Sequence, residues 1–363
     1  MKLVAQTCLA CVMILLVGLS LPAVADKPVR VFILAGQSNM QCKVQLKLLD
    51  HQIKDAKTAE MFSYLHKDGD YITRDDVFMD YLGKRGGLTP AFEVGRSNRY
   101  GVEISFGHKM GDYFDEPVLL IKTAWGGKSI GRDFLPPSKM LSDDQFKQLA
   151  IEAKAKYEQQ LENYKAKVAE GKKAREPKPA PSAEELKERH GYFYREMVSE
   201  VKASLAEMGE RFPQLKGKDY ELSGFVWHQG WNDQYGGLEL SYEENMEAFI
   251  KDVRKELNAP KLPFVIAVMG QNGSKEPKGA MLTIQQAQLA QQDKPAFKGN
   301  VKAVRTDVMV DKAAEELIAT WRQNIEQWEK TGSDHGYHYY GSAIWHHRMG
   351  QAFADAMLEL MGE

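Results

Sequence analysis

Short apolar runs recur along the chain and alternate with longer stretches whose apolar positions repeat at helical spacing. Each run has the length of a β-strand, and continuous apolar character is typical of a strand buried on both faces of a parallel sheet. The runs occupy residues 29–35, 117–121, 222–227, 264–269 and 301–304, and helices are expected at 192–208, 242–257 and 342–361. This alternation predicts an α/β fold, a three-layer α/β/α sandwich around a mainly parallel five-stranded sheet.

Residues 143–189 depart from this alternation because they are rich in Lys, Glu, Ala and Gln. A charged helix is expected at 151–168, and a segment rich in Lys and Pro at 171–181 interrupts it. Ser182 and Glu185 then have the spacing of a capping box, which starts another helix. We expect a charged helical insertion at the surface of the domain, with its charges facing solvent.

The first 25 residues have the organisation of a secretory signal peptide. Lys2 precedes an apolar run at 12–21, and an Ala-x-Ala pattern ends at Ala25. A membrane anchor is the alternative, but the apolar run is short and the cleavage pattern is clear. Cleavage after Ala25 would leave one domain, 26–363, exported to the periplasm or secreted and no longer held at the membrane.

Composition excludes several classes of protein. With 48 Lys+Arg against 50 Asp+Glu, the net charge of -2 argues against a nucleic-acid binder. Signal cleavage leaves Cys42 as the last of three cysteines, so no internal disulfide is expected and Cys42 is interpreted as a packed thiol. No metal-binding or phosphate-binding motif occurs, so no metal or cofactor is expected. Nothing predicts the oligomeric state.

The first strand runs directly into Gly36-Gln37-Ser38-Asn39-Met40. A serine on a tight turn after a strand can present its hydroxyl at the edge of the sheet, where functional groups of parallel sheets gather. Met40 stands where the nucleophile elbow of α/β-hydrolases has its second glycine, so this is a different turn. The alternative role for Ser38 is a helix cap.

The second and third strands also end in residues suited to binding an oxyanion. Gly126 and Gly127 follow the second strand, and paired glycines let backbone N–H groups approach a ligand, although they also suit a plain tight turn. Gln229 and Asn232 follow the third strand, and either amide can donate a hydrogen bond. The neighbouring Trp125 and Trp231 can each stack on a sugar or pack in the core.

A serine nucleophile needs a base and a group that orients it. Four of the nine histidines lie in the tail, and His338 is the predicted base because it immediately precedes the last helix. Asp334 is the candidate acid. The adjacent His346 and His347 point in different directions on a helix and do not form a metal site.

Taken together, these blocks resemble the SGNH hydrolases, whose fold is flavodoxin-like. Within that superfamily they are most similar to sialate O-acetylesterase-like proteins and to family six carbohydrate esterases. The blocks are 36–40, 101–107, 125–127, 227–230 and 338–343. The resemblance spans nearly all of the mature chain outside the insertion.

The resemblance implies a role for each block. Ser38 matches the nucleophile, and its own N–H matches one oxyanion donor. The glycine donor is Gly127 or Gly126, with Gly127 slightly favoured. The third donor is Gln229 if the His-Gln-Gly pattern applies, or Asn232 if the Gly-x-Asn-Asp pattern applies.

Two positions depart from the family pattern. Trp231 replaces the Glu that commonly follows His-Gln-Gly. The acid often stands three residues before the histidine, where this chain has His335, whereas Asp334 lies four residues before His338. Asp307 is the alternative acid.

The resulting hypothesis is an exported serine esterase that removes O-acetyl groups from carbohydrate. Ser38 attacks the ester, His338 transfers protons, and activity falls below about pH 6–7 as the base becomes protonated. The irregular tail and the missing Glu leave a non-catalytic glycan-binding protein as an alternative, because a fold does not by itself determine function. A lipase or thioesterase of the same superfamily is the third possibility.

Overall fold

The computed structural model describes residues 27–92 and 98–363, so the predicted signal peptide and its cleavage after Ala25 lie outside the described residues. A sheet in the order β11-β10-β9-β1-β8-β5-β6 forms the centre of the protein. All five predicted strands belong to it and pair in parallel. They are β1 (Val29–Gly36), β8 (Val118–Ala124), β9 (Tyr220–His228), β10 (Phe264–Val268) and β11 (Val301–Arg305).

The sheet has seven strands, so the prediction of five was wrong. β5 (Val77–Tyr81) pairs in parallel with β8, and β6 (Lys84–Gly87) adds the single antiparallel edge. The apolar pattern missed them because β5 contains Asp80 and β6 contains no large apolar residue. Asp80 is tolerated in a buried strand since it accepts hydrogen bonds from Ser204 and Arg211, each at 2.8 Å.

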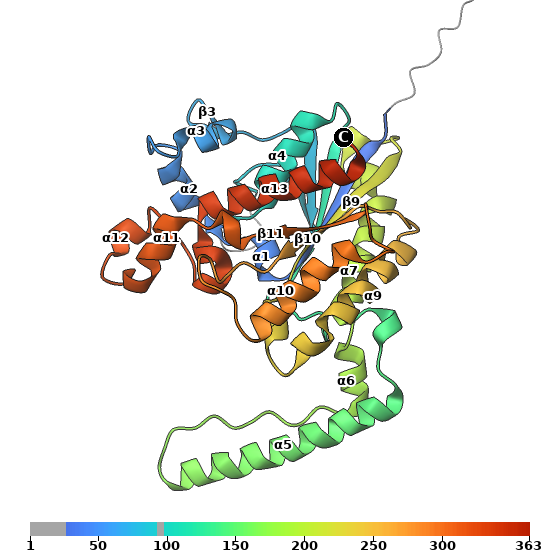
Figure 1. Cartoon of the computed structure of the whole chain (residues 1–363), viewed down its shortest axis with the longest axis vertical. Helices are drawn as coiled ribbons and strands as arrows, with labels where there is room; N and C mark the ends of the chain where they lie inside the picture. Colours follow the sequence, from blue (N-terminus) through green and yellow to red (C-terminus); the bar gives the residue numbers. More distant parts are fainter. Residues whose placement is uncertain (1–26, 93–97) are drawn as a thin grey trace, which may run out of the picture.

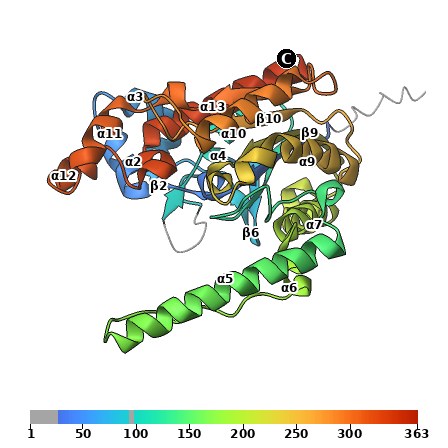
Figure 2. The ribbon, with the colours of Figure 1, turned by 60° about the horizontal axis from the view of Figure 1, so that its bottom comes forward.

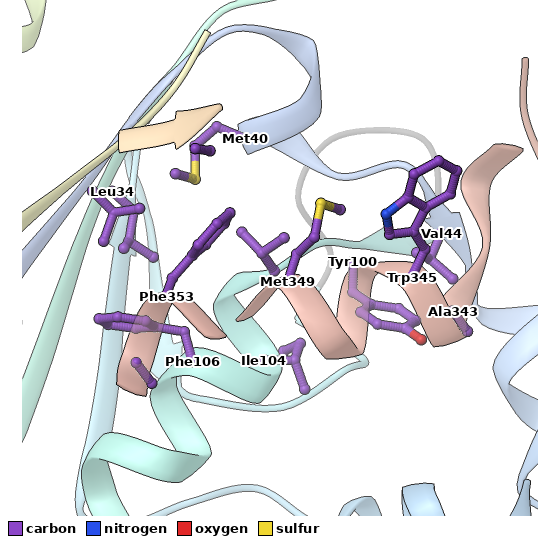
Figure 3. Packing of buried hydrophobic residues seen from close by; sticks show 14 of the residues in the cluster. Leu34, Met40, Val44, Tyr100, Ile104, Phe106, Ala343, Trp345, Met349 and Phe353 are labelled. Carbon is purple, nitrogen blue, oxygen red and sulfur yellow. The ribbon is translucent and has the colours of Figure 1, made fainter. Parts of the chain in front are cut away.

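Helices cover both faces of the sheet (Figure 1). Alternate residues of β1 point to opposite faces, so Phe32 and Leu34 join one apolar cluster while Val31 and Ile33 join the other. The first cluster lies under α4 (Glu103–Tyr113) and α13 (Ala343–Met361), as Figure 3 shows for Phe106, Met349 and Phe353. The second lies under α7 (Tyr192–Ala206), α9 (Tyr242–Glu256) and α10 (Ala280–Ala290).

The insertion extends away from this body (Figure 2). Its α5 (Asp143–Ala169) begins at Ser142 and α6 (Ala183–Arg189) begins at Ser182, each with a complete capping box. Phe146 is the one buried residue of α5. The return segment 170–182 contains neither helix nor strand.

Short helices and strands connect the main elements. No helix within residues 27–92 and 98–363 has the length and apolar character required to cross a membrane. The short helices are α1 (Ser38–Gln41), α2 (Leu46–Gln52), α3 (Ala59–Phe62), α8 (Met208–Arg211), α11 (Lys312–Leu317) and α12 (Ile325–Trp328). Two small antiparallel pairs are β2 (Val44–Gln45) with β7 (Arg99–Tyr100), and β3 (His66–Lys67) with β4 (Asp70–Tyr71).

Candidate active site

The carboxyl ends of β1, β8 and β9 meet at one edge of the sheet, and Ser38 lies there at the start of α1. Gly36 permits the turn, because it has φ of +151° and a Cβ there would lie 2.2 Å from the carbonyl oxygen of His228. Only glycine fits between the two strands at this point. Ser38 is therefore held at the sheet edge by the close pairing of β1 with β9.

The structure brings Ser38, His338 and Asp334 together. Ser38 Oγ lies 3.1 Å from His338 Nε2, and His338 Nδ1 lies 2.9 Å from Asp334 Oδ1. Asp334 precedes the short 3-10 segment Gly336–Gly341 that carries the histidine, and an irregular loop brings the two side chains together, because His335 is extended and His338 has non-helical φ and ψ. The alternative acid, Asp307, instead binds Arg305.

The electrostatics of the pair define the proton positions. Burial disfavours the charged form of Asp334, but hydrogen bonds from His338, from the His335 N–H at 2.7 Å and from Arg99 hold its pKa well below the usual range. Burial lowers the pKa of His338, although Asp334 opposes the shift. An ionised Asp334 only accepts, so Nδ1 carries the proton and Nε2 is free to accept from Ser38.

A strained turn holds the histidine in place. Tyr339 and Tyr340 have φ of 52° and 59°, values that side chains other than glycine rarely adopt. The Tyr339 hydroxyl is buried and contacts His228 Nε2 at 3.2 Å and Thr306 Oγ1 at 3.0 Å. On the other side, Asn39 donates to the carbonyl of Tyr337 at 3.1 Å and ties the nucleophile turn to this loop. Sequence reasoning missed both anchors.

The two candidate glycines differ in their relation to Ser38. A Cβ on Gly126 would lie 3.6 Å from Ser38 Cβ, whereas a Cβ on Gly127 would meet nothing within 4 Å. Both glycines are exposed, and Gly127 has a left-handed φ of +72°. Gly126 is therefore the glycine that borders the serine side chain.

The two candidate amides also differ. Gln229 is buried, and its Nε2 donates to Lys128 O at 3.0 Å and to the buried carboxylate of Asp233. Asn232 is half-buried, and its Oδ1 accepts from Gln37 Nε2 at 3.3 Å. Its Nδ2 has no protein partner within the described part of the chain. The amide of Asn232 is thus oriented through Gln37, next to the serine, and retains a donor.

Gln37 and Asp233 hold the loop after β9 in place through hydrogen bonds, and the sequence predicted a role for neither residue. Gln37 Oε1 accepts from the N–H groups of Gly230 and Asn232 at 3.2 and 3.4 Å. Asp233 accepts from the N–H groups of Ile130 and Gly131 at 3.0 and 2.8 Å. Burial raises the pKa of Asp233 to about 6, against the effect of these hydrogen bonds. The signal available in the sequence was position, because Gln37 directly precedes Ser38 and Asp233 directly follows Asn232.

A buried ion pair lies next to the helix that Ser38 begins. Lys122 and Glu103 are 2.7 Å apart, and their side chains are 0% and 1% exposed. Lys122 Nζ also donates to the carbonyl of Gln41, the last residue of the helix that Ser38 begins. Burial favours the neutral amine, but the neighbouring Cys42 and Glu103 raise the pKa of Lys122. The ammonium therefore caps the carboxyl end of α1.

The predicted tryptophans have different positions. Trp125 packs on Phe193 and Phe134, with ring centroids 5.2 and 6.1 Å away, at the margin of the second apolar cluster. Trp231 lies 5.8 Å from the ring of Tyr337, which contacts the ring of His338 at 4.5 Å. Both tryptophans are partly buried against the second cluster, and Trp231 is the one that also contacts Tyr337, the neighbour of His338.

Three further residues from the sequence have structural partners. Cys42 is a buried free thiol whose pKa is raised by burial to about 12, in agreement with a packed thiol. His346 Nδ1 lies 2.9 Å from the Ser342 carbonyl, and His347 Nδ1 lies 3.0 Å from the Tyr64 hydroxyl. The two adjacent histidines thus have separate surroundings.

Comparisons with known proteins agree with this architecture. The sequence model of the carbohydrate esterases described as sialic acid-specific acetylesterases matches residues 28–174 and 180–359. A solved structure from Arabidopsis thaliana is 16% identical, with a TM-score of 0.50 over 92% of this chain and 98% of that chain, which shows a shared fold. No curated protein sequence matches.

Two other solved structures are more distant. A carbohydrate acetylesterase from Xanthomonas citri is 13% identical, with a TM-score of 0.45 over 78% of this chain and 51% of that chain. The structure of NanS is 12% identical, with a TM-score of 0.41 over 78% of this chain and 79% of that chain.

Proposed function

We propose, from the premise that this chain belongs to the sialic acid-specific acetylesterase family of carbohydrate esterases, that it deacetylates carbohydrate through Ser38, His338 and Asp334. The protein is a carboxylic ester hydrolase acting on acetylated carbohydrate. The observation that carries the mechanism is the hydrogen-bonded line from Ser38 Oγ through His338 to Asp334, with distances of 3.1 and 2.9 Å. This arrangement supports nucleophilic catalysis.

In the proposed reaction, Ser38 Oγ attacks the acetyl carbonyl while His338 Nε2 takes the hydroxyl proton. His338 then gives that proton to the departing sugar oxygen, and an acetyl-Ser38 ester remains. Water, deprotonated by His338, attacks this ester, and His338 returns the proton to Ser38 Oγ as the acyl bond breaks and acetate leaves. Asp334 stays ionised and stabilises the imidazolium that forms in each half of the cycle.

The tetrahedral oxyanion needs donors that are in place before it forms. We assign them to the N–H groups of Ser38 and Gly126 and to Asn232 Nδ2. Asn232 is preferred over Gln229 because the Gln229 amide is committed to Asp233 and Lys128. Gly126 is preferred over Gly127 because it borders Ser38. Trp231 is the proposed sugar-facing aromatic residue.

Export remains part of the proposal, supported by the sequence pattern at residues 1–25. Mass spectrometry of the protein from a periplasmic or culture fraction tests it. An N-terminus at Asp26 is expected, and an intact Met1 in that fraction would contradict cleavage after Ala25.

The decisive experiment measures acetate release from aryl acetates and acetylated glycans by the purified protein and by Ser38→Ala. The variant is expected to lose turnover by at least about 10³-fold while retaining its circular dichroism spectrum and Tm. Turnover that persists in folded Ser38→Ala overturns the nucleophile assignment. Binding of sugar without acetate release by the wild-type protein favours the glycan-binding alternative, and a rate rising with acyl chain length favours a lipase or thioesterase.

A further inference from the structure

A cavity of about 290 Å³ adjoins Asp334, the acid of the proposed triad. Asp334 and His335 form one wall, together with Arg99, whose guanidinium binds the Asp334 carboxylate. Trp321 and Trp328 form another wall. We call this cavity the Trp321 pocket; it lies between α2 and the segment containing α12, which occupy the same end of the molecule in Figure 1.

The lining of the Trp321 pocket combines aromatic rings with charges that are already paired. The rings of Trp321 and Trp328 are 6.3 Å apart at 42°. Lys47 forms an ion pair of 2.7 Å with Glu329, and Arg99 pairs with Asp334. Both cations are thus neutralised by carboxylates of the same pocket, which disfavours an anionic ligand. A neutral sugar suits the lining, because its C–H face packs on indole and its hydroxyls bond polar groups.

A row of aromatic rings connects the pocket with the catalytic base. The His335 ring at the pocket wall stacks on Tyr337, with centroids 5.0 Å apart and planes at 20°. Tyr337 is 40% exposed and contacts both the His338 ring and Trp231. This row of ring contacts links the pocket wall to the ring of His338, so an extended glycan is the kind of ligand that would reach both places.

We propose that the Trp321 pocket is a subsite for a neutral sugar residue of the substrate, a neighbour of the residue whose acetyl ester is cleaved at Ser38. The inference rests on the proposed function. It predicts that the enzyme acts on acetylated oligosaccharides or glycan chains in preference to acetylated monosaccharides. Specificity is then determined by a site separate from the one where the ester is hydrolysed.

The test compares kcat/KM for an acetylated oligosaccharide with that for the matching acetylated monosaccharide. Trp321→Ala is expected to lower the ratio of the two values about tenfold, the loss of about 1.4 kcal/mol of binding. Ile325→Arg, at a pocket residue that is 54% exposed, should lower it as well by filling the pocket. Because Ile325 is exposed, this second variant removes no core packing, and it tests the subsite even if Trp321→Ala does not fold.

The matched control is Tyr220→Ala, since Tyr220 is 45% exposed and begins β9 at the sheet edge opposite Ser38. It should leave the ratio unchanged. An unchanged ratio in both pocket variants overturns the subsite, while activity that survives Ser38→Ala overturns the proposed mechanism instead. Calorimetry should show that Ser38→Ala binds the deacetylated oligosaccharide and that adding Ile325→Arg to this variant removes the binding. Equal affinity of the single and the double variant also contradicts the subsite.

Discussion

Two Lys–Glu pairs of similar length lie in contrasting parts of the molecule. Lys122 and Glu103 are 2.7 Å apart next to the helix that Ser38 begins, with side chains 0% and 1% exposed. Lys165 and Glu162 are 2.9 Å apart on α5 of the insertion, with side chains 59% and 73% exposed. Lys165 and Glu162 are hydrated by water even when their side chains are apart. Lys122 and Glu103 have no access to water, so each charge depends on the other and on neighbouring protein groups. Burial, rather than distance, therefore determines what such a pair contributes.

The same contrast separates the two regions. The edge of the sheet around Ser38 is built from buried polar groups that depend on one another, such as Gln37, Gln229 and Asp233. The insertion is built from a capped helix whose charged residues face solvent. Substitutions of the same chemical kind should consequently have large effects at the edge and small effects on the helical insertion at 143–189, which we call the arm.

The largest expected effect is that of breaking the buried pair. Lys122→Met leaves the Glu103 carboxylate buried without its cation and should lower the free energy of unfolding by about 3–5 kcal/mol. Urea denaturation followed by circular dichroism measures this. The double variant Lys122→Met with Glu103→Leu should recover much of the loss, because no unpaired charge remains. A single variant as stable as the wild type would contradict the comparison.

Two amides at the site sharpen the comparison. Asn232→Ala should lower kcat by about 10²–10³ with little change in Tm, because it removes a donor to the oxyanion. Gln229→Ala should instead destabilise the fold by about 1–3 kcal/mol, because it leaves buried partners such as Asp233 unsatisfied. Steady-state kinetics and thermal unfolding of both variants separate the roles. The reverse result would assign the oxyanion donor to Gln229.

Acid affects the buried site more than the arm. Burial lowers the pKa of His338 from 6.5, so the acid limb of kcat/KM should lie below pH 6.5, and a flat profile down to about pH 4 would contradict its role as base.

Burial also lowers the pKa of His228 to about 3 and of His346 to about 4. Below about pH 6.5 the unfolded chain therefore binds protons that the folded chain does not, and stability falls as pH decreases toward 4. Thermal unfolding across pH 4–8 distinguishes unfolding from titration of the base.

The smallest effect is expected on the arm. Lys165→Ala removes an exposed pair and should change Tm by no more than about 2 °C, with no change in kcat/KM on aryl acetates. Scanning calorimetry and a kinetic assay measure both. A loss comparable with that of Lys122→Met would show that the arm carries structure or function beyond a solvated helix.

The sequence by itself determined the elements with strong local signals. Continuous apolar runs identified five of the six parallel strands, and the sequence pattern identified α7, α9 and α13, within a few residues of their observed ends. The Ser182 capping box was equally readable, because both of its hydrogen bonds connect residues three apart. Ser38 and His338 were candidates for a similar reason, as each stands next to a predicted strand or helix.

Only the tertiary structure decided what depends on distant segments. The apolar pattern did not predict β5, because Asp80 interrupts it. The structure tolerates Asp80 in a buried strand because Arg211, 131 residues further along the chain, donates a hydrogen bond to it. The structure places Asp334 rather than Asp307 beside His338, leaves a free donor on Asn232 rather than on Gln229, and places Trp231 against Tyr337. Each of these positions depends on loop paths and on which hydrogen bonds are already made. Spacing along a chain specifies what one helical turn or one strand can bring together. It does not specify which buried group has its partner elsewhere, and at this edge of the sheet that partner determines which residue remains free to react.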